Sequence, residues 1–157
     1  MATIREQITD DVVALLNAGS PPVTVKRSYG FAVDLEAAKS IIVYPKSDVA
    51  DPPLGGRTGG LSNVPVKRML TLAVECRSKG TPTERADAEA DVLAAWVVKT
   101  ICGKKKGPAD AGGPLYHGIT EGETTFEYDQ RDHAYCLVTV EILVAYQSRA
   151  NDPETWA

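Results

Sequence analysis

The sequence predicts an α+β fold, in which a mostly antiparallel sheet of four to five strands carries two main helices packed on one face. In two segments the apolar residues recur every three or four positions, which is typical of amphipathic helices. In the segments between and after them, apolar and polar residues alternate, which is typical of strands with one buried face. This order of elements and a length of 157 residues indicate a single domain, 1–157.

The first helix is predicted near the N-terminus, in TIREQITDDVVALLNAG. Thr3 and Glu6 form a capping-box pattern at its start, and Gly19 follows the last apolar residue as a stop signal. The apolar stripe of this helix consists of Ile4, Ile8, Val12, Leu15 and Leu16. Two short strands are expected next, VTVKR at 23–27 and SIIVYP at 40–45, with one helical turn, DLEAAK, between them.

A flexible loop is expected over about 48–65, which contains DPPLGGRTGGLSNVP. Its glycines resemble a phosphate-binding loop only superficially. A P-loop leads from a strand into a helix and ends in Gly-Lys-Ser/Thr, because backbone N–H groups and the helix dipole hold the anion. Here the glycines lead through Pro65 into a strand and no Lys-Ser/Thr follows. We therefore interpret this segment as a connection and predict no bound phosphate.

A long strand is predicted in MLTLAVECR, with Leu70, Leu72, Val74 and Cys76 on its buried face. The second helix is predicted in TPTERADAEADVLAAWVVKTICG, where Thr81 caps, Pro82 takes the first helical position, Glu84 completes the box and Gly103 ends the helix.

A second flexible loop is expected over about 103–114. A hairpin then follows, formed by LYHGITEGETTFEYD and AYCLVTVEILVAY around the short link DQRDH. A flexible C-terminal tail is expected over about 148–157.

Composition excludes several functional classes. With a formal net charge of −4, the chain does not produce the positive field that drives non-specific binding to nucleic acid. Cys76, Cys102 and Cys136 are far apart and are expected to be buried thiols, and neither His117 nor His133 has a cysteine at zinc-ligand spacing. The acidic N-terminus does not resemble a signal peptide and no apolar run reaches membrane-spanning length, so we expect no membrane contact.

No catalytic set is apparent, so we predict that the protein is not an enzyme and uses no cofactor, metal or small-molecule substrate. Asp132 could orient His133, but adjacent polar residues of this kind are typical of turns. Glu121, Glu123 and Glu127 share one strand parity, which predicts an acidic sheet face that is solvated or faces a partner.

Basic residues concentrate in the predicted loops and at their borders. They could serve solubility, bind nucleic acid, or pair with the acidic strand face of another copy. These residues are Arg57, Lys67, Arg68 and Lys104 to Lys106.

Three stretches together resemble the tail terminator proteins of tailed phages, the minor tail protein U group. They are the helix IREQITDDVVALLN, the strand RMLTLAVECRSKG running into the helix ADAEADVLAAWVVKTI, and the hairpin GITEGETTFEYDQRDHAYCLVTVEILVAY. The resemblance spans Ile4 to Tyr146 and rests on element order and pattern, with no invariant motif. Head-completion and neck connector proteins have similar layouts and remain an alternative, and a small nucleic-acid-binding module is a further one.

The resemblance implies a non-enzymatic virion protein of the tail or neck, assembled in the host cytoplasm. It implies a homohexamer ring that caps the tail tube protein, ends tail polymerisation and offers a surface to the head-tail connector protein. Because ring closure needs two different faces of each subunit to meet, we expect acidic residues of one copy to contact basic residues of the next. The residues expected at this interface are Arg57, Lys67, Arg68, Glu121, Glu123, Glu127 and Glu141.

Overall fold

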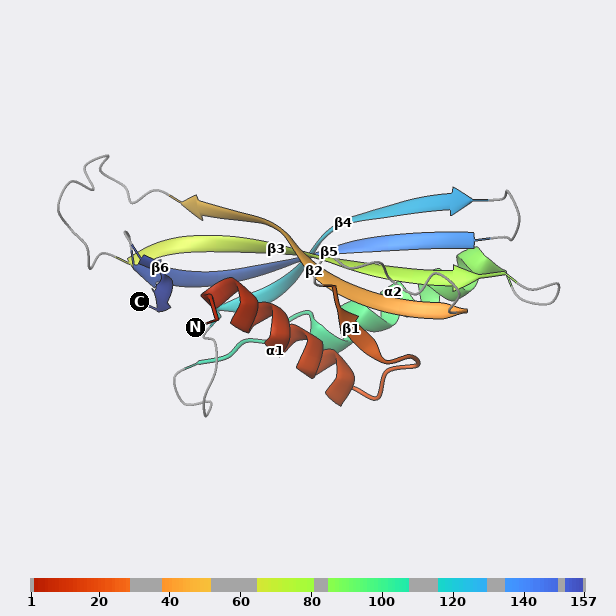
Figure 1. The fold of residues 1–157 in the computed structure, drawn as a ribbon, viewed down its shortest axis with the longest axis horizontal. Coiled ribbons are helices and arrows are strands. Elements are labelled where there is room, and N and C mark those ends of the chain that lie inside the picture. Colours follow the sequence, from red (N-terminus) through yellow and green to blue (C-terminus); the bar gives the residue numbers. More distant parts are fainter. Residues whose placement is uncertain are drawn as a thin grey trace.

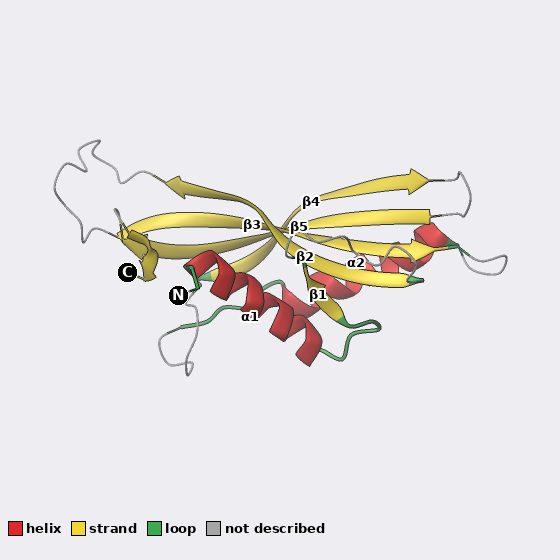
Figure 2. Ribbon diagram, viewed as in Figure 1, coloured by secondary structure: helices red, strands yellow, loops and turns green. Residues whose placement is uncertain are grey.

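The computed structural model describes residues 2–28, 38–51, 65–80, 85–107, 116–129, 135–149 and 152–156. It confirms the α+β fold class, with helices packed against a mostly antiparallel sheet (Figures 1 and 2). In chain order the elements are α1 (Ile4–Ala18), β1 (Val25–Arg27), β2 (Lys39–Asp51), β3 (Pro65–Lys79), α2 (Ala86–Ile101), β4 (Gly118–Asp129), β5 (Tyr135–Arg149) and β6 (Asp152–Trp156).

The strands lie in the order β1-β2-β3-β5-β4, and the short β6 adds a sixth strand by pairing with the end of β5. Only β1 and β2 run parallel, whereas the other pairs are antiparallel. β3 occupies one edge of β5 along its whole length. β4 and β6 therefore share the other edge of β5: β4 pairs with residues from Tyr135 to Ala145, and β6 pairs with Ser148 and Arg149 beyond the start of β4.

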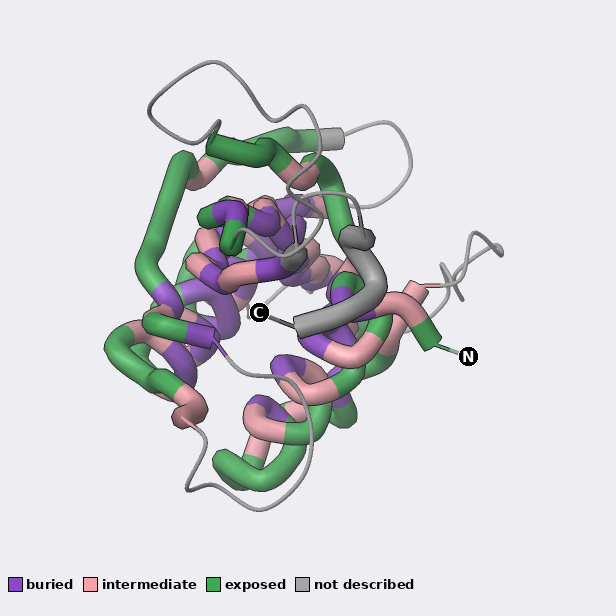
Figure 3. The backbone as a smooth tube through the Cα atoms, turned by 90° about the vertical axis from the view of Figure 1, so that its left-hand side faces the viewer, coloured by how far each residue is buried: buried purple, intermediate pink, exposed green. Residues whose placement is uncertain are grey.

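One core lies between the sheet and the two helices (Figure 3). The alternation predicted for the long strands is confirmed, because Leu70, Leu72 and Val74 pair with Val144, Ile142 and Val140 and all six are essentially fully buried. We call this side of the sheet the helix face and the opposite side the outer face. The stripe of α1 also packs into the core, with Ile4, Ile8, Val12 and Leu16 fully buried.

The predicted capping box of α1 is confirmed. The Thr3 backbone N–H donates to Glu6 Oε2 at 2.7 Å, and the Glu6 N–H donates to Thr3 Oγ1 at 3.3 Å. Gly19 caps the other end, and its lack of a side chain matters for packing: a Cβ there would lie 2.6 Å from Cγ2 of Thr100 on α2. Glycine at this position lets the two helices approach each other closely.

The predicted start of α2 is wrong. The helix begins at Ala86 and has Arg85 as an N-cap without a side-chain cap hydrogen bond. Arg85 has extended backbone angles, φ −84° and ψ 123°, so a helix could not run through it from Pro82. The predicted cap, Thr81, lies outside the described residues. The predicted end is confirmed, since Gly103 follows with a φ of +84°, a conformation that glycine tolerates best.

The strands are longer than the sequence pattern indicated. Part of the loop expected over 48–65 is strand, because β2 continues to Asp51 and β3 begins at Pro65. The tail expected over 148–157 is also partly strand: Ser148 is fully buried in β5, and 152–156 forms β6. Residues 52–64 and 108–115 lie outside the described part of the chain, as do 34–37 of the expected helical turn.

The sheet extends well beyond the helices that cover it. A 15-residue strand such as β3 spans about 50 Å, whereas the 15 residues of α1 span about 22 Å. Figure 1 shows the resulting shape, a long twisted sheet with both helices on one side. Large parts of the sheet ends are therefore left without a covering helix.

Candidate assembly surfaces

A bulge in β2 decides which side chains face inward at one end of the sheet. Pairing with β3 shifts between Pro45 and Ser47, which leaves Lys46 as the extra residue. Before the bulge, Ile41 and Val43 face the helices, whereas after it the even-numbered positions do. As a result the carboxylate of Asp48 is buried on the helix face, and Val49, 63% exposed, projects from the outer face.

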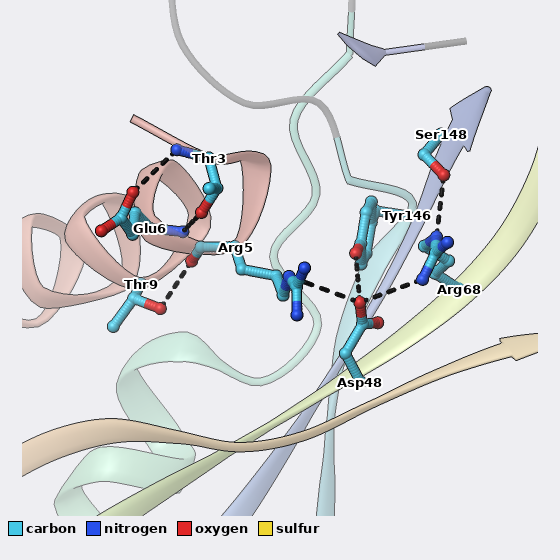
Figure 4. A network of polar contacts seen from close by, with 8 residues as sticks. All are labelled: Thr3, Arg5, Glu6, Thr9, Asp48, Arg68, Tyr146 and Ser148. Atoms are coloured by element: carbon cyan, nitrogen blue, oxygen red, sulfur yellow. Dashed lines mark hydrogen bonds and ion pairs between the residues drawn. The ribbon is translucent and has the colours of Figure 1, made fainter. Parts of the chain in front are cut away.

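Asp48 is the centre of a buried polar network that joins four elements (Figure 4). Its Oδ2 accepts hydrogen bonds from the Tyr146 hydroxyl at 2.9 Å and from Arg68 Nη1 at 3.2 Å. Arg5 of α1 completes an ion pair, with Nε 3.7 Å from the same oxygen. The side chain of Asp48 is only 6% exposed, so these contacts replace water at Oδ2, whereas Oδ1 is buried without a hydrogen-bond partner among the described residues.

Arg68 and Tyr146, which contact Asp48, are themselves held by further interactions. Arg68 Nε donates to Ser148 Oγ at 2.8 Å, which links β3 to the end of β5. Burial, reinforced by the hydrogen bond to Asp48, raises the pKa of Tyr146 far above its ordinary value. The tyrosine therefore stays a hydrogen-bond donor at any physiological pH. We conclude that the network fastens α1 to the part of the sheet that extends beyond the helices.

A second polar cluster lies on the outer face, across β2, β3 and β5. The Tyr44 hydroxyl donates to Glu75 Oε1 at 2.8 Å, and Arg77 Nη2 donates to Glu75 Oε2 at 3.1 Å. The Arg77 guanidinium also lies 6.0 Å from the centre of the Tyr135 ring. Burial and the bond to Glu75 raise the pKa of Tyr44 to about 12. Both oxygens of Glu75 are satisfied in this way, whereas Nε and Nη1 of Arg77 are buried and have no hydrogen-bond partner among the described residues.

A second bulge corrects the predicted acidic face. The register of β4 against β5 shifts between Glu121 and Thr124, so the parity of the strand changes there. Glu121 pairs with the buried Ile142 and lies on the helix face, whereas Glu127 pairs with Leu137 on the outer face. Glu123 lies in the bulge. The three glutamates therefore do not line a single face, contrary to the expectation from their spacing.

An apolar pocket of about 750 Å³ lies on the outer face at the end of the sheet where β2 stops and β3 begins. Its floor follows from the strand register: Val49, Met69 and Ala145 lie side by side, and Asp51, Lys67 and Gln147 form the next row. Val49 and Met69 are 63% and 39% exposed. Lys67 and His117, both exposed, also line it. We call these residues the outer-face pocket.

A second exposed apolar surface lies near the far end of β4. Phe126 and Tyr128 pair with Val138 and Cys136, which places both aromatic rings on the helix face. They are nevertheless 49% and 62% exposed, because α2 covers β3 and β5 and makes little contact with β4. A groove between α2 and β4, lined in part by Asp91, Lys99 and Glu121, reaches Thr124, two residues before Phe126 on the same face. We call Phe126, Tyr128, Asp91 and Glu121 the aromatic patch.

Of the residues predicted for a subunit interface, some are exposed and others are already paired within their own chain. Lys67 is exposed and lines the outer-face pocket, and Glu127 is exposed on the outer face. Arg68 is 16% exposed and is engaged by Asp48, so it is directed into its own subunit. Glu141 is likewise paired within the chain, with Lys46. Arg57 lies outside the described residues. Only part of the predicted set is therefore available to a neighbour.

The described residues bear on the metal and nucleophile chemistry that the sequence could supply. They contain no group of three His, Cys, Asp or Glu side chains that could hold a metal ion. Burial raises the pKa of all three cysteine thiols, that of Cys76 to about 12, which disfavours the nucleophilic thiolate. Asp132 and His133 lie outside the described residues. In the described chain, neither helix has the length and apolar character needed to cross a membrane.

Comparisons with known proteins identify no family. No protein-family model matches the chain, and no curated protein matches it. Among solved structures, the fold is similar to a chain described as "Virion of native gene transfer agent (GTA) particle". The sequences are 13% identical, the match covers 91% of this chain and 92% of that chain, and the TM-score is 0.48. At this level the similarity carries no argument about function.

Proposed function

We propose that the protein is a structural component of a phage-like virion, which assembles as a homo-oligomeric ring, caps the tail tube and ends its polymerisation. In this role the other side of the ring forms the head-facing interface. The proposal continues the resemblance of the sequence to tail terminator proteins. It is supported by a fold that exposes apolar surfaces suited to assembly.

The observation that carries the proposal is the pair of unlike apolar surfaces at the two ends of the sheet. Val49 and Met69 are exposed at one end, and Phe126 and Tyr128 at the other. Soluble monomers rarely expose clustered large apolar side chains, because water contact with them is unfavourable. Covering both surfaces in an assembly would remove this cost.

Two different surfaces on one subunit favour a head-to-tail contact. Such a contact leaves one surface of each kind unused until the chain of subunits closes, and closure by rotation produces a ring. A symmetric dimer would instead bring the same surface of both copies together. The arrangement therefore supports a ring, with six as the copy number that the resemblance implies.

A head-completion or neck connector protein is the alternative within the same structural class. It would use the same kind of ring at a different position in the particle. A nucleic-acid module is disfavoured by the net charge of −4 and by the engagement of Arg68 and Lys106 with Asp48 and Asp11. Binding of DNA at low salt that weakens steeply as the salt concentration rises would instead support a nucleic-acid-binding function.

Two measurements test the proposed function. Light scattering coupled to size exclusion should show a concentration-dependent change from monomer to a closed oligomer of about six copies. Tails assembled without the protein should exceed their normal length in electron micrographs, and adding the protein back should restore it. Tails of normal length in its absence would refute the capping role, and a strict monomer at high concentration would refute the ring.

A further inference from the structure

We propose that the aromatic patch of one copy inserts into the outer-face pocket of the next copy, and that this contact is the joint of the ring. The inference rests on the proposed function, because it names the surfaces through which the ring would close. It adds which residues meet and why they meet only between copies.

The two surfaces cannot meet within one subunit. β4 begins beside the pocket, where Gly118 pairs with Ala145, and carries Phe126 and Tyr128 eight and ten residues further along. At the rise of an extended strand this separation is about 30 Å. The pocket also lies on the outer face, whereas the aromatic rings lie on the helix face. Only a second copy can bring the patch to the pocket.

Size and apolar character match. A pocket of about 750 Å³ lies in the upper part of the range that accommodates ligand-sized groups, roughly 300 to 1,000 Å³. Aromatic side chains bury about 150 to 250 Å² each and dominate the energetics of interfaces. Val49, Met69 and Ala145 offer them an apolar floor. The tyrosine hydroxyl can remain at the polar rim.

Charged side chains of both signs line the two surfaces, Asp51 and Lys67 at the pocket and Asp91, Lys99 and Glu121 at the groove beside the patch. Lys67 lines the pocket and has no ion-pair partner in the described part of the chain. Asp91 and Glu121 line the groove between α2 and β4, and neither has an ion-pair partner among the residues that the structure describes. Opposite charges at a rim select partner and orientation more than they add affinity. They would therefore fix the direction of the head-to-tail contact.

Addition of one strand edge to another is a less suitable joint. The exposed edge of β2 contains Pro45, which cannot donate a backbone hydrogen bond, and a bulge beside it. β4 also contains a bulge, between Glu121 and Thr124. Bulges, prolines and charges are features that prevent edge-to-edge pairing of sheets. The copies are thus expected to meet through side chains and a pocket.

The test uses one variant for each surface in the full-length chain. Met69→Asp places a charge on the pocket floor, and Tyr128→Asp places one in the patch. Each side chain is exposed in the subunit, so folding should be retained, which circular dichroism would check. We expect each variant alone to associate at least about thirtyfold more weakly, as loss of a central anchor does. The matched control is Val92→Asp, an exposed apolar position outside both surfaces, which should assemble normally.

Mixing the two variants gives the decisive result. Each retains one intact surface, so an equimolar mixture should form heterodimers and nothing larger. A rim test accompanies it: Lys67→Glu should weaken association about tenfold, and Asp91→Lys in the same chain should recover most of the loss.

The outcomes separate this inference from the proposed function. If the wild-type chain forms rings but Met69→Asp and Tyr128→Asp also form them, the joint proposed here is wrong and the ring stands. If mixing restores full rings or gives no heterodimer, the head-to-tail pairing of these two surfaces is likewise refuted. If the wild-type chain forms no oligomer and tails keep their length without it, the proposed function itself fails.

Discussion

Replacing Asp48 by asparagine should destabilise the subunit without changing its fold. The amide has nearly the same volume as the carboxylate but no charge. It would still accept a hydrogen bond from Tyr146, so that contact survives. The change removes the negative charge opposite Arg68 and Arg5, which lie 3.2 Å and 3.7 Å from Oδ2.

The magnitude follows from the exposure of the partners. Breaking a fully buried ion pair costs about 3 to 5 kcal/mol, because the remaining charge is left without water. Arg68 is 16% exposed and Arg5 is 45% exposed, so both can regain part of their hydration. We therefore expect a loss of about 2 to 4 kcal/mol in the free energy of unfolding. For a domain of this size that corresponds to a fall in Tm of roughly 5 to 15 °C.

Urea unfolding followed by circular dichroism measures this loss. Glu123→Gln, at an exposed position of β4, is the matched control and should change stability by less than about 0.5 kcal/mol. Asp48→Leu combined with Arg68→Met and Tyr146→Phe should be better tolerated than Asp48→Asn alone, because it leaves neither a buried charge nor the tyrosine hydroxyl without its partner. A loss below about 1 kcal/mol for Asp48→Asn would refute this reasoning, because it would show that the ion pairs of Asp48 contribute no more than exposed pairs do.

Three further predictions concern packing, a second ion pair and pH. Gly19→Ala should cost about 1 to 3 kcal/mol in thermal unfolding, since its Cβ would lie 2.6 Å from Cγ2 of Thr100, and Thr100→Ala in the same chain should recover part of the loss. Asp11→Asn should speed amide hydrogen exchange in the segment after α2 severalfold, because Asp11 holds the charged Lys106 side chain at 2.9 Å; unchanged exchange would contradict a role in anchoring it. Stability should fall as pH rises above about 9, because burial raises the pKa of Cys76 from its ordinary value to about 12, so the unfolded chain loses this proton first and the loss continues until the folded pKa is passed. Unfolding free energies measured between pH 7 and 11 test this, and Cys76→Ala should flatten the profile.

The sequence pattern predicted the helices and the faces of the long strands well, because burial imposes a period that is visible in the residues themselves. The stripe of α1 and the alternation around Leu72 and Ile142 are examples. The start of α2 was wrong because a good local capping pattern around Thr81 does not compel a helix. The extended backbone of Arg85 shows that the chain turns into the helix later.

The bulges explain the other errors. Strand parity carries no mark of an inserted residue, so the glutamates of β4 were assigned to one face although the register shifts after Glu121. The polar network around Asp48 was missed for the same reason. One signal did exist: continuing the buried parity of β3 and β5 outward reaches Arg68 and Tyr146, polar residues at positions that should be apolar. Such a pair on neighbouring strands indicates a buried partner between them.

The extra residue in β2 changes which residue numbers face the helices: odd-numbered positions do so before Lys46 and even-numbered positions after it. Deleting Lys46 would leave Pro45 opposite Leu72 and Ser47 opposite Thr71, so the ladder would become regular and Asp48 would keep its place opposite Leu70 on the helix face. The insertion therefore sets the local bend and twist of β2, while the pairing that places Asp48 inside and Val49 outside holds with or without it.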